Sequence, residues 1–213
     1  MEVKIIKNKS SDNSQLRQGK RMLANFEACR IDLKTDLPLL FETFEEALAK
    51  TNKLISNFPP TSRARILEAS IIQSCFAEFL FKNFGDKAFY GKHKRLVLRL
   101  KGYIILFKKL DRKGLPMNIT TTNVQSILNQ NKTLDLFADS VYSEDPILYF
   151  GYQKTKLGEL VNPQLIYIDE EQIKFSIGEN EFGYVRTLDF NPVQTGATPR
   201  LKTKVETERK KII

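Results

Sequence analysis

The sequence predicts an α+β fold in which N-terminal helices pack on a C-terminal antiparallel sheet of about five strands. Apolar residues recur at helical spacing through residues 15–84, and after Gly85 the pattern changes to the period of two that is typical of strands. Helices followed by strands are the order of an α+β domain. We expect a flexible arm over 1–14, a single domain over 15–190 that is helical over 15–85 and mainly β over 92–180, and a basic tail over 191–213.

The first two helices are expected over residues 15–31 and 37–58. The second has the clearer pattern, because its apolar residues fall on one face at intervals of three and four. Pro59 and Pro60 should end it, since proline lacks the N–H that a helix interior needs.

The third helix is expected over residues 62–84, with Gly85 as its terminator. Its start, TSRARILE, places Arg63 and Arg65 in the first turn, where the helix dipole disfavours cations by about 0.3–1 kcal/mol each. Backbone amides of a helix start together with two arginines can hold a phosphate. The alternative is that both arginines form ion pairs with nearby acids such as Glu68.

The β half is expected to begin with a hairpin whose strands cover 95–100 and 103–109. Lys101 and Gly102 fit a two-residue turn. In that register Leu98 faces Ile105 and Leu100 faces Tyr103, which gives one apolar side. A short helix near 121–130 and strands near 147–153, 164–168 and 172–177 should follow.

The other side of this hairpin carries positive charge, because the same register places Arg95 opposite Lys108. Like charges directly opposite each other destabilise a strand pair, by a few tenths of a kcal/mol up to about 1 kcal/mol. A bound phosphate would turn this repulsion into a clamp. We therefore expect the side that carries Arg95, Arg99 and Lys108 to bind an anionic polymer.

The net charge of the chain is +9, and residues 87–113 carry all of it, with ten basic side chains against one acid. Such a local excess is typical of proteins that contact a phosphate backbone, although a solvated basic surface is the alternative. The residues expected to contact nucleic acid are Arg63, Arg65, Lys92, Lys94, Arg99, Lys109, Arg112 and Lys113.

His93, the single histidine, lies among these cations, which should keep its imidazole neutral near pH 7. A neutral imidazole beside phosphate-binding cations can act as a general base. The alternative is an ordinary surface residue.

Motifs for other chemistries are absent from the sequence. It has no P-loop, no GxGxxG, no GxSxG and no HExxH, and its two cysteines, Cys29 and Cys75, form no CxxC. We therefore expect no cofactor and no metal site. No stretch approaches the roughly 18 apolar residues of a membrane span, so we expect a cytoplasmic protein without a membrane partner.

Residues 95–130 contain an arginine-bearing strand, the strand YIILFKKL, a proline and the helix of LPMNITTTNVQSIL. This order resembles the core of RelE/HigB-type toxin ribonucleases. More broadly, FPPTSRAR, FKKL with MNI, and YFGYQ are similar to an uncharacterised bacterial family of toxin–antitoxin and phage-defence loci, whose partner is a helix-turn-helix protein. The resemblance implies that Arg95, Lys108 and Lys109 bind or polarise the scissile phosphate and that a tyrosine takes part.

The sequence thus predicts a toxin-like bacterial effector that acts on RNA, more than on DNA, and has an antitoxin partner. As a metal-independent ribonuclease it would use Tyr103, Lys108, His93 and Arg95 near the phosphate that the ribose 2′-OH attacks. The alternative is a noncatalytic nucleic-acid-binding regulator or accessory protein. A third hypothesis is an interaction protein whose basic face docks an acidic partner.

Overall fold

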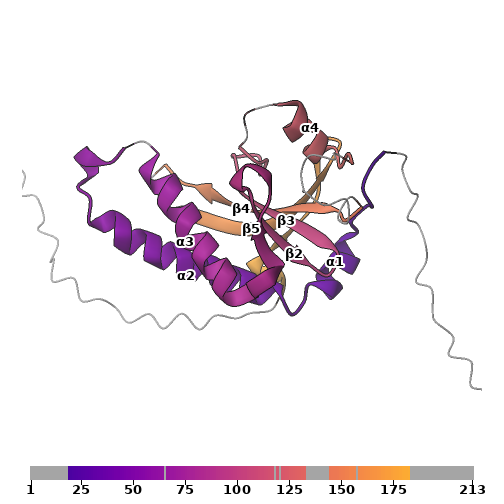
Figure 1. The fold of residues 1–213 in the computed structure, drawn as a ribbon, viewed down its shortest axis with the longest axis horizontal. Helices are drawn as coiled ribbons and strands as arrows, with labels where there is room; N and C mark the ends of the chain where they lie inside the picture. Colours follow the sequence, from indigo (N-terminus) through magenta and orange to yellow (C-terminus); the bar gives the residue numbers. More distant parts are fainter. Residues whose placement is uncertain are drawn as a thin grey trace, which may run out of the picture.

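Three helices precede the strands along the chain and a fourth lies between the third and fourth strands, so the fold is α+β as predicted (Figure 1). The computed structural model describes residues 19–64, 66–117, 119, 121–132, 144–156 and 158–182. The expected arm and tail lie outside these residues.

Four helices of the described chain cover the two faces of the sheet. They are α1 (Phe26–Asp32), α2 (Leu37–Ser56), α3 (Leu67–Phe84) and α4 (Thr122–Leu128). The first is shorter than expected because the Asn25 side chain accepts hydrogen bonds from the N–H groups of Glu27 and Ala28 and caps its start. In the part of the chain that the structure describes, no helix is long and apolar enough to cross a membrane.

The start of α3 differs from the expectation, and its end agrees with it. Pro60–Ser62 form a short 3-10 turn, so that α3 begins only at Leu67. Gly85 ends the helix with φ of 54°, a conformation that glycine adopts without strain.

The sheet has six strands, not about five, and it is mixed, not antiparallel. Its spatial order follows the chain: β1 (Ala88–Tyr90), β2 (Leu96–Leu100), β3 (Tyr103–Lys109), β4 (Ile147–Lys154), β5 (Leu160–Asp169) and β6 (Gln172–Gly178). Strand β1 spans three residues, too few to show an alternating pattern. Strands β3 and β4 pair in parallel because the chain between them, which includes α4, is long enough for a crossover.

The register predicted for the β2–β3 hairpin is confirmed. Leu98 pairs with Ile105 and Leu100 with Tyr103. The turn residues Lys101 and Gly102 both have positive φ, 45° and 82°, as in the tight turns that match the twist of a hairpin.

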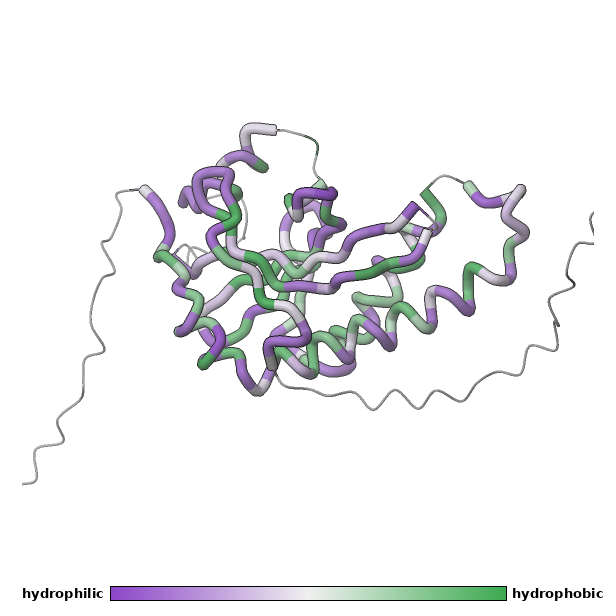
Figure 2. Tube along the Cα trace, turned by 180° about the vertical axis from the view of Figure 1, so that it is seen from behind, coloured by the Kyte–Doolittle hydropathy of each residue, from purple (hydrophilic) through white to green (hydrophobic). Residues whose placement is uncertain are grey.

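Two apolar cores enclose the sheet. Helices α1 to α3 cover one face, where Leu98 and Ile105 pack with helix residues such as Phe44. On the other face Val97 and Ile104 pack with Ile127 of α4. Figure 2 shows the apolar residues gathered in the central strands and the hydrophilic ones in the loops at the rim. On the side of the hairpin that carries Arg95, Arg99 and Lys108, the intervening residues Val97, Ile104 and Leu106 are therefore buried.

A buried glutamine holds the crossover in place. The Gln130 side chain donates hydrogen bonds from Nε2 to the carbonyl oxygens of Ile147 (2.9 Å) and Ile168 (2.8 Å). Its Oε1 accepts from the N–H of Ile147 at 3.0 Å. These contacts satisfy polar groups that would be costly to bury alone, and they fix the point at which β4 begins beside β3 and β5.

Gly151→Ala tests the packing at the far end of this parallel pair. A Cβ at position 151 would lie 2.5 Å from Cγ of the buried Leu110, so the substitution should lower the free energy of unfolding by about 1–3 kcal/mol. Gly178→Ala is the control, because nothing lies within 4 Å of the added Cβ. Denaturant unfolding should separate the two variants, and equal stabilities would contradict the packing of Leu110 on β4.

Candidate functional site

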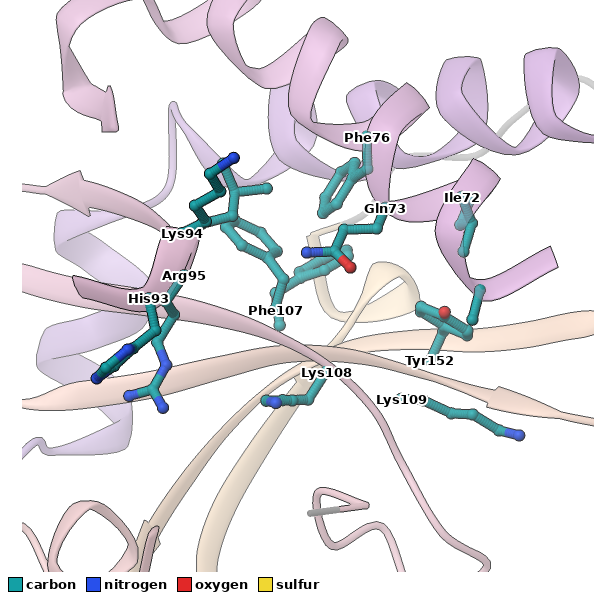
Figure 3. Close-up of a pocket in the computed structure, with 13 residues that line it drawn as sticks. Ile72, Gln73, Phe76, His93, Lys94, Arg95, Phe107, Lys108, Lys109 and Tyr152 are labelled. Carbon is teal, nitrogen blue, oxygen red and sulfur yellow. The ribbon is translucent and has the colours of Figure 1, made fainter. Parts of the chain in front are cut away.

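A pocket of about 410 Å³ lies where α3, the turn before β2 and the ends of β3 and β4 meet (Figure 3). This volume falls in the range of small-molecule and nucleotide sites. Aromatic and basic side chains line it together: Phe76, Phe107, Phe150 and Tyr152 with His93, Lys94, Arg95, Lys108 and Lys109. Among the described residues that line the pocket, none is acidic.

The turn before β2 presents His93 and Arg95 to this pocket. His93 and Lys94 have φ of 57° and 53°, a left-handed conformation that costs residues with a Cβ roughly 1–2 kcal/mol each. The N–H of Gly91 donates to the carbonyl oxygen of Arg95 at 2.8 Å and closes the turn. Backbone strain of this kind gathers at functional sites, because it aims side chains that a relaxed turn would direct elsewhere.

Arg95 and Lys108 lie close together on one side of the strand ends. Figure 3 shows the Lys108 amine directed toward Arg95, with His93 beside it. Burial lowers the pKa of Lys108, and the positive charge of Arg95 lowers it further. Two partly buried cations therefore repel each other here, and an anion between them would relieve that repulsion.

The structure adds Tyr149, which the sequence did not single out. It pairs with Leu106 in the parallel register, and Gly151, two residues on, pairs with Lys108, so Tyr149 lies on the same face as Lys108. Burial raises the pKa of its hydroxyl, while the nearby charge of Arg95 lowers it. Its position depends on the parallel pairing of β3 and β4, which was not expected.

Tyr152 forms the wall of the pocket. Its ring stacks on Phe44 with centroids 5.3 Å apart. Burial raises the pKa of its hydroxyl to about 12, with a smaller contribution from the negative charge of the nearby Glu68. The side chain therefore stays a neutral phenol.

Tyr103 lies apart from the pocket. It begins β3, whereas Lys108 lies near the end, and it faces α1 from the other side of the sheet. Its hydroxyl donates a hydrogen bond to Oδ2 of Asp32 at 3.0 Å. Burial and this hydrogen bond raise its pKa. The structure thus gives Tyr103 a contact that ties α1 to the sheet, and does not bring it together with His93, Arg95 and Lys108.

Two expected phosphate contacts are also elsewhere. Arg99 forms an ion pair with Asp145 at 3.1 Å. Arg63 precedes α3 instead of lying in its first turn, and its Nε donates to the carbonyl oxygen of Phe58 at 2.9 Å. Arg65 lies outside the described residues.

The remaining expected contacts surround the pocket or continue beyond it. Lys92 is exposed on the turn that carries His93. Arg112 lines a second hollow, which shares Lys109 with the first, and Lys113 is exposed on the turn after β3.

Within the part of the chain that the structure describes, no three His, Cys, Asp or Glu side chains are placed to hold a metal ion. Cys29 and Cys75 are buried free thiols. Burial raises the pKa of the Cys29 thiol to about 12, with a smaller contribution from the negative charge of the nearby Asp32. The thiol is therefore unreactive.

Lys108→Met tests the repulsion between Lys108 and Arg95. Methionine keeps the length of the side chain without its charge, so the free energy of unfolding at pH 7 should rise by up to about 1 kcal/mol. In the parent the lowered pKa of Lys108 means that the unfolded chain binds more protons than the folded one between that pKa and 10.5. The parent therefore gains stability as the pH rises through this window, and the advantage of the variant shrinks.

Denaturant unfolding at pH 7 and at about pH 10 measures this difference. Lys109→Met is the matched control, because its side chain is exposed, and it should change stability little at either pH. A loss of stability in Lys108→Met at pH 7 would mean that the Lys108 charge is stabilised in the folded protein.

The chain matches no protein-family model, no curated protein and no solved structure. Its function must therefore be argued from the residues of the pocket.

Proposed function

We propose that the protein binds RNA through this pocket. The observation that carries the proposal is the pair Arg95 and Lys108, two partly buried cations that face each other with no acid among the described lining residues. Such a pair is unfavourable for the free protein, and becomes favourable when an anion occupies it.

A phosphodiester fits this pair in geometry and in charge. The planar guanidinium of Arg95 can donate two parallel hydrogen bonds to phosphate oxygens, while the Lys108 ammonium supplies a point charge. Lys94 and Lys109 line the same pocket and add to the attraction. Long-range attraction by this cluster would also speed the approach of a polyanion.

The aromatic lining favours a nucleotide over a simple anion. Phe107 and Tyr152 line the pocket on the face of the sheet that carries Lys109, across the strands from Lys108. Unpaired bases of RNA bind to aromatic side chains by stacking. Tyr152 has one ring face against Phe44, so a base would meet its other face. The pocket therefore combines a phosphate position with an apolar position for a base or ribose.

A toxin-like ribonuclease is the second candidate function, and His93 favours it. The imidazole lines the same pocket as Arg95 and Lys108. It would take the proton of a ribose 2′-OH as that oxygen attacks its own phosphate, and would return the proton to the 5′-oxygen when the P–O5′ bond breaks. The two cations would stabilise the negative charge that develops on the phosphate, without a metal ion. In this role the protein would act in a bacterial toxin–antitoxin or phage-defence system, with an antitoxin partner, as the resemblance to RelE/HigB-type toxins implies.

Arg95→Ala and Lys108→Ala test binding. Each removes a charge-assisted contact of about 1.5–3 kcal/mol, so the affinity for a short RNA should fall roughly 10- to 150-fold. Lys53→Ala, on the exposed end of α2, is the control for loss of one charge and should bind as the parent does. Fluorescence anisotropy at several salt concentrations measures both effects, and affinity that does not depend on salt would contradict phosphate binding.

His93→Ala separates cleavage from binding. If His93 transfers the proton, its loss should slow cleavage of labelled RNA in a chelator by about 10²–10⁴, with little change in RNA affinity. Tyr103→Phe should lower the free energy of unfolding by about 0.5–1.5 kcal/mol, through loss of its bond to Asp32, and leave the cleavage rate unchanged. Growth and RNA integrity after induction in bacteria provide the second readout. If the parent protein neither inhibits growth nor cleaves RNA, the ribonuclease role is contradicted and RNA binding is the role that remains.

A further inference from the structure

A second hollow, of about 660 Å³, adjoins the pocket at Lys109. It lies between the turn after β3, the end of β4 and the start of β5. Its lining includes Lys109, Arg112, Met117, Lys154, Lys156 and Asn162. The first pocket and this hollow share one side chain, that of Lys109.

Positive charge also dominates this second hollow. Four basic side chains line it, whereas Asp111 is the acid among its described lining residues. The Asp111 carboxylate is engaged by its own turn, since Oδ1 accepts from the N–H groups of Lys113 (2.8 Å) and Leu115 (2.9 Å). Lys154 forms an ion pair with Glu68, which leaves Lys109, Arg112 and Lys156 to face an anion.

The two hollows follow one another along the parallel strands. Lys108 pairs with Gly151 and Lys109 with Tyr152, and Lys108, Lys109 and Tyr152 line the first pocket. The next residues, Leu110 and Gln153, border the second. The N–H of Leu110 donates to the carbonyl oxygen of Tyr152 at 2.8 Å, so the backbone is continuous and ordered across the junction. Lys109 therefore marks the point where the two hollows meet.

Resting on the proposed RNA binding, the geometry points to a single-stranded segment as the ligand, with one nucleotide at Arg95 and Lys108 and a following nucleotide in the hollow lined by Arg112 and Lys156. Lys109 contacts the backbone between them. A duplex would present paired bases and a rigid backbone, and neither could enter a pocket of about 410 Å³. A free mononucleotide would leave the second hollow empty.

The test compares uridine 5′-monophosphate with oligouridines of two, four and eight nucleotides by calorimetry and anisotropy. For the parent the affinity should rise from the monophosphate to the longer strands, because each added phosphate meets another cation. In Arg112→Ala/Lys156→Ala the affinity for the octamer should fall tenfold or more, and the affinity for the monophosphate should stay unchanged. The slope of log affinity against log salt should become shallower by about 0.7 for each phosphate that the variant no longer neutralises.

Lys53→Ala/Lys174→Ala removes two charges outside both hollows and serves as the matched control; it should keep the parent's dependence on length. An octamer affinity unchanged in Arg112→Ala/Lys156→Ala would overturn the second position while RNA binding at Arg95 and Lys108 stands. Equal affinity for a duplex of the same length would overturn the single-stranded ligand. If the parent binds neither the monophosphate nor any oligomer, the proposed function fails, and this inference with it.

Discussion

The parallel pairing of β3 with β4 is the constraint on which the site depends. A strand paired in this way has the crossover on one face and the remaining helices on the other, so its middle is buried on both sides. Its end is the part that reaches the pocket, and there the register places Lys108 beside Gly151. The same register places Tyr149 near Arg95. The hydrogen bonds of Gln130 fix this register at the opposite end of β4.

Two locally unfavourable features meet at the end of these strands. Lys108 is partly buried against the charge of Arg95, and the left-handed backbone at His93 and Lys94 adds strain. Left-handed residues with a Cβ also occur elsewhere in the described chain, at Gln130, Glu170 and Glu171 among others, but without a buried pair of cations beside them. Places where a sequence breaks more than one local rule at once are most often places where it binds or reacts with something, and the coincidence of strain and paired cations supports the proposed site.

Local patterns in the sequence were sufficient to predict α2, the β2–β3 hairpin and its register, because each depends on neighbouring residues. The parallel pairing joins residues 43 positions apart, so period-two alternation could not distinguish it from antiparallel pairing, and Tyr149 was missed with it. Tyr103 was a different case. The predicted register already placed it opposite Leu100 on the apolar side of the hairpin. Successive residues of a strand face opposite sides of the sheet, so Tyr103 and Lys108, five positions apart, must lie on different faces. The prediction of Tyr103 as a catalytic residue depended on the resemblance to tyrosine-using ribonucleases and not on strand alternation.

The position of the cations also bears on the choice between RNA and an acidic protein as the partner. The exposed side chains of Lys92 and Lys113 could meet carboxylates on a flat surface, but the partly buried Lys108 must be reached by a group that enters the pocket. A phosphate group on a flexible single strand can enter the pocket, where hydrogen bonds from the Arg95 guanidinium replace its hydration shell. The acidic surface of a folded protein would contact the rim of the pocket before its carboxylates reached Lys108. A recessed pair of cations in a pocket that aromatic rings also line therefore favours a nucleotide, and a docking surface for a protein would not need this feature.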